Sequence, residues 1–137
     1  MIILSALILA AVPPAPSGQS LPYGEVEILN PIAPAVAAYH DCLNSDLGKS
    51  GALLSPDRSR YRRGWEAAMR ACANVRAESV AEAERALAQA LDYQDPARRD
   101  LAIRHAFEGT DEWFRRRPEI MEQVRRDSLA LQRQRQN

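Results

Sequence analysis

The chain has 137 residues, of which 46% are hydrophobic and 26% are charged. That length suits one domain and is too short for two ordinary ones. Lysine and arginine together number 18, as do aspartate and glutamate, so the formal net charge is zero. A neutral chain argues against binding to nucleic acid by bulk electrostatic attraction, and no nucleic-acid partner is expected.

The first twelve residues form an uncharged apolar run that ends at Pro13 and Pro14. Its length is typical of the hydrophobic part of a signal peptide and falls short of the ~20 residues that a membrane-spanning helix needs. Small residues at 15–17 suit cleavage, so we expect a signal peptide at residues 1–17 and a periplasmic or secreted mature chain. Because no Lys or Arg precedes the run, an uncleaved anchor and a buried first helix are the alternatives.

Residues 18–30 are predicted to form an extended N-terminal arm. Apolar and polar side chains alternate over part of this segment. A short strand would fit, but no segment elsewhere in the chain offers it a partner. A first helix is expected from Pro31, after a cap at Asn30, to a stop at Gly48. Its apolar stripe consists of Ile32, Val36, Tyr39, Cys42, Leu43 and Leu47.

One long helix is predicted for residues 55–93. The start signal is Ser55-Pro56-Asp57, where the Ser hydroxyl can cap and Pro suits the first helical position. Gly64 is its weakest position, and Asp95-Pro96 ends it. Apolar residues recur at helical intervals, namely at Tyr61, Trp65, Met69, Cys72, Val75, Val80, Ala83, Leu87 and Leu91.

A third helix is expected after a cap at Asp95 and to close at Gly109. Thr110 then signals another start, and we expect Pro118 to begin the main part of the last helix. Residues 133–137 are expected to form a frayed tail.

Cys42 and Cys72 are the only cysteines, and an even count in an exported chain favours a disulfide between them. In a tight hairpin of the first two helices, the two sulfurs would lie ~15 Å out of register. The linker spans up to ~26 Å when extended, so bonding requires residues 57–63 to reach beyond the end of the first helix. The expected fold is therefore an all-α domain over residues 31–132. In it, a long central helix forms a disulfide-linked helical hairpin with one or two further C-terminal helices.

Metal binding and catalysis have little support. Zinc ligation would have to use His40, Asp41, Cys42, Cys72 and His105, which lack the paired spacing of zinc sites. No nucleophile elbow, phosphate loop, dinucleotide fingerprint or metalloprotease helix occurs in the sequence. We therefore expect a non-enzyme without a metal or other cofactor.

Arginine clusters supply the candidate site. They are Arg58, Arg60, Arg62 and Arg63 at the start of the long helix, and Arg115, Arg116 and Arg117 just before Pro118. One interpretation is solvated charge paired within the molecule, for example between the acidic end of the long helix and the C-terminal helix. The other is a patch that binds envelope phosphates or an acidic partner; sparse aromatic residues weigh against nucleic acid.

Four segments resemble small exported proteins of unknown function from Gram-negative, alphaproteobacteria-like bacteria. The segments are 39–43 (YHDCL), 67–72 (AAMRAC), 97–100 (ARRD) and 103–107 (IRHAF). The resemblance covers about two thirds of the mature chain and implies export and a paired cysteine, with no activity attached.

The first functional hypothesis is a non-enzymatic interaction or structural protein of the cell envelope, whose partner is an envelope protein or an anionic envelope component. An alternative is a small-ligand or anion carrier, which requires a pocket between the third helix and the long helix. An enzyme with scattered site residues would instead require convergent buried carboxylates or histidines.

Overall fold

The structure is a computed structural model that describes residues 19–20 and 27–136. The expected signal peptide, residues 1–17, lies outside this part of the chain. The described elements are β1 (Gln19–Ser20), β2 (Glu27–Ile28), the short 3-10 helix η1 (Asn30–Ile32), α1 (Ala33–Lys49), α2 (Arg58–Ala71), α3 (Ala73–Ala88), the 3-10 helix η2 (Leu91–Tyr93) and α4 (Pro96–Gln136). The predicted all-α class is confirmed.

The extended arm pairs with itself. β1 and β2 are antiparallel, with Gln19 opposite Ile28 and Ser20 opposite Glu27. The sequence showed no pairing partner for a strand here, and the start of the same arm supplies one.

The limits of α1 differ from the prediction at both ends. Asn30 begins η1, and α1 starts at Ala33 with no side-chain cap on its first amides. Gly48 does not end the helix, which continues to Lys49. The chain reverses at Gly51, whose positive φ of 66° is a conformation that glycine adopts without strain.

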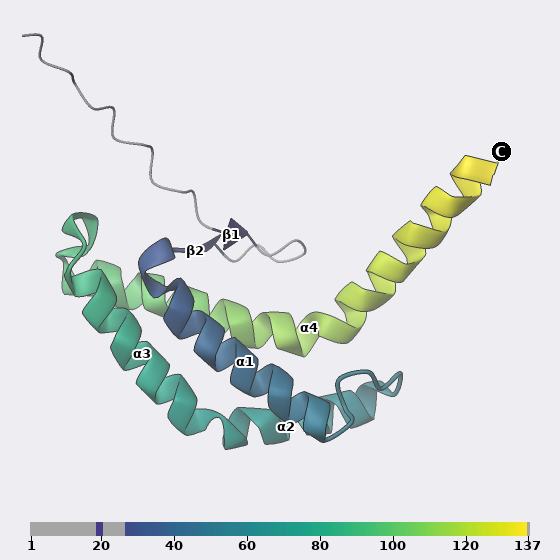
Figure 1. Cartoon of the computed structure of the whole chain (residues 1–137), viewed down its shortest axis with the longest axis horizontal. Helices are drawn as coiled ribbons and strands as arrows, with labels where there is room; N and C mark the ends of the chain where they lie inside the picture. Colours follow the sequence, from purple (N-terminus) through teal and green to yellow (C-terminus); the bar gives the residue numbers. More distant parts are fainter. Residues whose placement is uncertain (1–18, 21–26, 137) are drawn as a thin grey trace, which may run out of the picture.

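The single long helix predicted for residues 55–93 is wrong, because it is broken at Cys72. That residue has φ −93° and ψ 8°, and it closes α2 while opening α3. The start was also misplaced by two residues: the cap is Asp57 and not Ser55. The Asp57 carboxylate accepts from the amide of Ser59, whereas the hydroxyl of Ser55 accepts from the amide of Asp57. The break lets α2 and α3 curve along α1 (Figure 1).

The last two predicted helices form one continuous helix, α4, which is 41 residues long and includes both Gly109 and Pro118. The cap at Asp95 is present, since its carboxylate accepts from the amide of Ala97 at 3.0 Å. Residues 133–136 belong to α4 although a frayed tail was expected there. Figure 1 shows α4 bending and its C-terminal part projecting away from the other helices.

The disulfide between Cys42 and Cys72 is present, with the two Cα atoms 6.0 Å apart. Gly64 lies against the end of α1: a Cβ added there would come 2.3 Å from the Cβ of Ala52 and 3.5 Å from a methyl of Leu47. Residues 57–63, which come before Gly64 in the chain, therefore lie beyond the end of α1. The disulfide requires this arrangement.

The core lies where the helices meet, and each of the four α-helices contacts the other three. Its largest fully buried side chains are Tyr39, Phe107, Phe114, Ile32, Leu43, Leu47 and Leu87. A polar contact crosses this core: the Tyr39 hydroxyl donates to Asp111 at 2.6 Å, and Arg76 donates to the other oxygen of that carboxylate at 3.1 Å. These residues come from α1, α4 and α3, so the contact fixes the three helices relative to one another.

Candidate arginine site at the bend of α4

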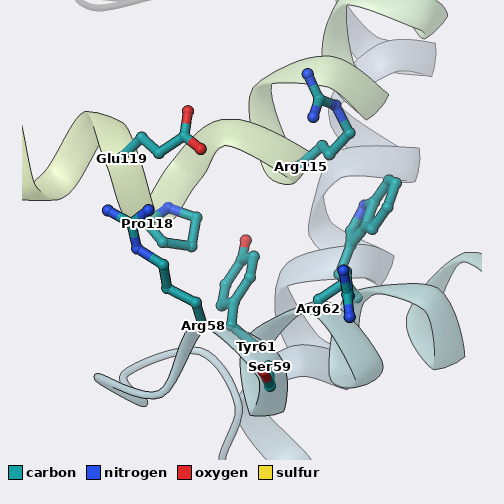
Figure 2. Close-up of a pocket in the computed structure, with 8 residues that line it drawn as sticks. Arg58, Ser59, Tyr61, Arg62, Arg115, Pro118 and Glu119 are labelled. Atoms are coloured by element: carbon teal, nitrogen blue, oxygen red, sulfur yellow. The ribbon is translucent and has the colours of Figure 1, made fainter.

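The fold brings together members of the two arginine clusters. Arg58 and Arg62 of α2 line a solvent-open hollow of about 290 Å³, together with Arg115 of α4 (Figure 2). The remaining lining residues are Ser59, Tyr61, Trp65, Pro118 and Glu119. In Figure 2, Tyr61 stands between Arg58 and Arg62, with Pro118 above it. The hollow therefore lies where α2 meets the bend of α4.

The other four predicted arginines lie elsewhere. Arg60 is beside Gly51, where an added Cβ would come 3.2 Å from its guanidinium. Arg63 is exposed and lines neither this hollow nor the groove described below. Arg116 faces a separate hollow with Ile120 and Gln123. Arg117 donates to the side chain of Asn44 at 3.1 Å and lies over the ring of Trp113.

Two of the three converging arginine side chains lack a partner among the described residues. The guanidinium groups of Arg58 and Arg62 form no hydrogen bond or ion pair in that part of the chain. Arg115 donates two hydrogen bonds to Glu112, at 2.7 and 2.5 Å, and this pairing lowers the pKa of Glu112. Both members of that pair are exposed, so it contributes little to stability and can exchange with a ligand. Among the described residues that line the hollow, Glu119 is the one acidic residue.

The predicted pairing of the acidic end of the long helix with the C-terminal helix is present only in part. Glu84 of α3 accepts from Arg99 near the start of α4 at 2.6 Å. The later arginines of α4 pair locally instead, as Arg125 and Arg126 both do with Glu122. Their hydrogen bonds lower the pKa of Glu122 to about 2.

Tyr61 fixes the geometry of the site. Its side chain is buried, and its hydroxyl donates to the backbone carbonyl of Phe114 at 2.7 Å. In a regular helix that carbonyl would accept from the amide of residue 118, but a proline there has no N–H to give. Burial raises the pKa of Tyr61 to about 12, partly opposed by the charge of Arg117. Tyr61 thereby satisfies the carbonyl that Pro118 leaves unpaired and joins α2 to the bend of α4.

A second, larger hollow adjoins the first. It is a groove of about 580 Å³ between the α1–α2 loop and α4, lined by Leu53, Leu54, Ser55, Pro56, Arg117, Met121, Glu122, Arg125 and Arg126. Arg58, Tyr61 and Pro118 line both hollows. Two of its apolar residues are well exposed, Leu54 at 87% and Met121 at 53%.

Sequence reasoning missed this groove. The detectable signal was a pair of leucines, Leu53 and Leu54, just before the start of a helix; Leu53 packs against the core and Leu54 is exposed. Trp65 and Tyr61, two of the apolar residues that recur along the predicted long helix, are largely buried, yet they also form part of the wall of the arginine hollow. The indole N–H of Trp65 is buried without an acceptor among the described residues.

Cys42 and Cys72, two of the five candidate zinc ligands, form the disulfide and are therefore not free to bind zinc. Elsewhere in the described part of the chain, His, Cys, Asp and Glu form no group of three or more that could hold a metal ion. His105, another of the candidate zinc ligands, is exposed.

None of the helices in the described residues is both long and apolar enough to span a membrane. No protein-family model, curated protein or solved structure matches the chain. The function is therefore argued from the site itself.

Proposed function

We propose that this is an exported, non-enzymatic interaction protein of the cell envelope that binds an anionic partner in the arginine hollow. The observation that carries the proposal is the placement of Arg58 and Arg62, which have no partner in the described residues, beside Arg115 from the other end of the chain. Guanidinium groups stay charged at all physiological pH values and match the geometry of phosphates and carboxylates.

Export is supported by two features. The apolar run at the N-terminus is typical of a signal peptide. The disulfide between Cys42 and Cys72 is compatible with an oxidising compartment, in which such bonds persist. We place the protein in the periplasm.

The exposure of the arginines sets limits on the partner. An exposed ion pair contributes about 0–1 kcal/mol and weakens with salt, so a single contact would not hold a ligand. A partner must therefore present several negative oxygens, as phosphate-bearing envelope components do. Binding should weaken as ionic strength rises.

The test uses inorganic pyrophosphate as the probe, titrated into the mature protein by calorimetry at low and at physiological salt. Arg58→Gln, Arg62→Gln and Arg115→Gln are combined in one variant, which we expect to lose at least about tenfold in affinity, the equivalent of ~1.4 kcal/mol. The matched control combines Arg60→Gln, Arg63→Gln and Arg116→Gln, removing the same charge from the same two helices outside the hollow. Equal affinity in both variants would show that general charge, and not this site, attracts the anion.

A carrier for a small ligand is the second candidate function. It is favoured by the groove that adjoins the arginine hollow, since its volume of about 580 Å³ lies within the ~300–1,000 Å³ common for ligand pockets.

A further inference from the structure

The arginine hollow and the groove are contiguous and chemically different. Arg58, Tyr61 and Pro118 line both, so one ligand can extend from one into the other. The hollow presents guanidinium groups, whereas the part of the groove formed by the α1–α2 loop presents Leu53, Leu54 and Pro56. The pair forms a site with one cationic end and one apolar end.

Part of the groove lining, formed by Leu54, Ser55, Pro56, Tyr61, Pro118 and Met121, offers few free hydrogen-bonding groups. The hydroxyl of Ser55 already accepts from the amide of Asp57, and that of Tyr61 donates to the carbonyl of Phe114. Pro56 and Pro118 have no amide hydrogen, and Leu54 and Met121 are apolar. An extended peptide would bury its backbone N–H and C=O groups there without partners, at a cost that an alkyl chain does not incur.

We propose that the site binds an amphiphilic anion, with an acyl or alkyl chain in the groove and a phosphate or carboxylate head in the arginine hollow. This inference rests on the proposed anion-binding function and names the chemical class of its ligand. Burial of Leu54 and Met121, which are 87% and 53% exposed without a ligand, supplies the apolar contribution. Arg58, on the border between the two hollows, contacts the head where the chain begins.

The rim of the groove has the charge that such a ligand needs. Arg117, Arg125 and Arg126 of α4 line the groove, and Glu122, the one acidic residue among its described lining residues, is already paired with Arg125 and Arg126. In the hollow, the negative charge of Glu119 repels an anionic head. The Glu119→Gln change should therefore tighten binding of an anion.

The probe is dodecyl phosphate below its critical micelle concentration, titrated into the mature, disulfide-bonded protein by calorimetry. Inorganic phosphate supplies the head alone, and dodecyl maltoside supplies the same chain with a neutral head. Each methylene removed from water strengthens binding about fourfold, so dodecyl phosphate should bind at least about tenfold tighter than inorganic phosphate even if only part of the chain is covered. Dodecyl maltoside should bind at least about tenfold more weakly than dodecyl phosphate, because it forms no charge-assisted hydrogen bonds with the arginines.

The double substitution Leu54→Gln and Met121→Gln should weaken binding of dodecyl phosphate at least about fivefold, through loss of apolar contact, and leave pyrophosphate binding unchanged. Both residues are exposed, so the fold does not depend on them. Leu91→Gln combined with Leu131→Gln is the matched control, since these residues are 90% and 57% exposed and line none of the hollows described above. The control should bind dodecyl phosphate as the unchanged protein does.

The outcomes separate this inference from the proposed function. If pyrophosphate binds in the hollow but dodecyl phosphate binds no more tightly than inorganic phosphate, the proposal of an amphiphilic ligand is overturned and the proposed anion site remains. If neither pyrophosphate nor dodecyl phosphate binds, both the anion site and the amphiphilic ligand are overturned. Equal affinity for dodecyl maltoside would overturn recognition of the anionic head. Binding only to vesicles that contain phosphatidylglycerol, and not to monomeric dodecyl phosphate, would overturn the groove in favour of a bilayer surface.

Discussion

At the scale of single residues, the hydrogen bond from Tyr61 to the carbonyl of Phe114 holds the site together. Removing the hydroxyl with Tyr61→Phe leaves a buried carbonyl unpaired, because Pro118 has no N–H to offer. We expect the free energy of unfolding to fall by about 1–3 kcal/mol, measured by urea denaturation. Tyr93→Phe is the control, since the hydroxyl of Tyr93 makes no hydrogen bond within the described residues, and it should change stability little.

A double-mutant cycle with Pro118→Ala isolates the cause. Alanine restores the amide that can donate to the carbonyl of Phe114, so Tyr61→Phe should cost less in that background. An identical cost in both backgrounds would show that the tyrosine hydroxyl does not substitute for the missing amide of Pro118.

Buried tyrosines also predict a loss of stability at alkaline pH. Burial raises the pKa of Tyr61 to about 12, and burial together with the hydrogen bond to Asp111 raises the pKa of Tyr39 as well. In the unfolded chain both ionise near 10.0, so above that pH the unfolded state loses protons first and is favoured. The stabilisation is complete below about pH 10 and is lost as pH rises towards about 12.

Urea unfolding between pH 8 and pH 11 measures this loss. Each buried tyrosine adds a slope of up to ~1.4 kcal/mol per pH unit above its unfolded pKa. The slope should be shallower for Tyr61→Phe than for the unchanged protein. A free energy of unfolding that stays constant up to pH 11 would contradict the role of both hydroxyls.

At the scale of elements, periodicity and caps predicted where helices lie but not where they break. The sequence on both sides of Cys72 is rich in good helix formers, so no local signal marks the end of α2. The break lies at the residue that the disulfide joins to α1, a contact between positions 30 residues apart. Pro118 was expected to begin a new helix, but α4 continues through it, because the carbonyl of Phe114 that the proline leaves unpaired finds a donor in Tyr61, on another helix.

The two glycines in α1 and α2 give a matched prediction about packing. A Cβ at Gly64 would come 2.3 Å from the Cβ of Ala52, whereas nothing lies within 4 Å of a Cβ at Gly48. Gly64→Ala should therefore lower the free energy of unfolding, because overpacking costs about 1–3 kcal/mol and exceeds the ~1 kcal/mol gained in helix propensity. Gly48→Ala should raise it by up to ~1 kcal/mol, since it gains only the propensity. Thermal and urea unfolding of the two variants would test this, and stabilisation by both would show that α2 does not approach the loop so closely.

The candidate site was predicted only as two separate clusters. That Arg58 and Arg62 meet Arg115 depends on how α2 packs on α4, which no local pattern encodes. The selection of these three from seven arginines likewise depends on the rotation of each helix about its axis. Sequence reasoning could identify the charge, while its convergence is a property of the tertiary fold.

At the scale of the whole molecule, we expect the disulfide to contribute a large part of the stability. Aromatic residues make up only 6% of the chain, and several buried positions are alanines, so the core offers little apolar area. Replacing both cysteines, with Cys42→Ala and Cys72→Ala, should lower the free energy of unfolding by ~3–4 kcal/mol for a loop of this length. A loss below about 1 kcal/mol would indicate that helix packing alone defines the fold.

The same bond links folding to the compartment in which the protein works. If the chain is exported, as we propose, the signal peptide is removed and the thiols are oxidised in the periplasm. Protein recovered from that compartment should begin near Gly18 and should react with a thiol-alkylating reagent at Cys42 and Cys72 only after reduction. Intact mass spectrometry with and without reduction measures both properties on one sample. A full-length chain whose two cysteines are alkylated without reduction would contradict export and would remove the basis for an envelope ligand at the arginine hollow.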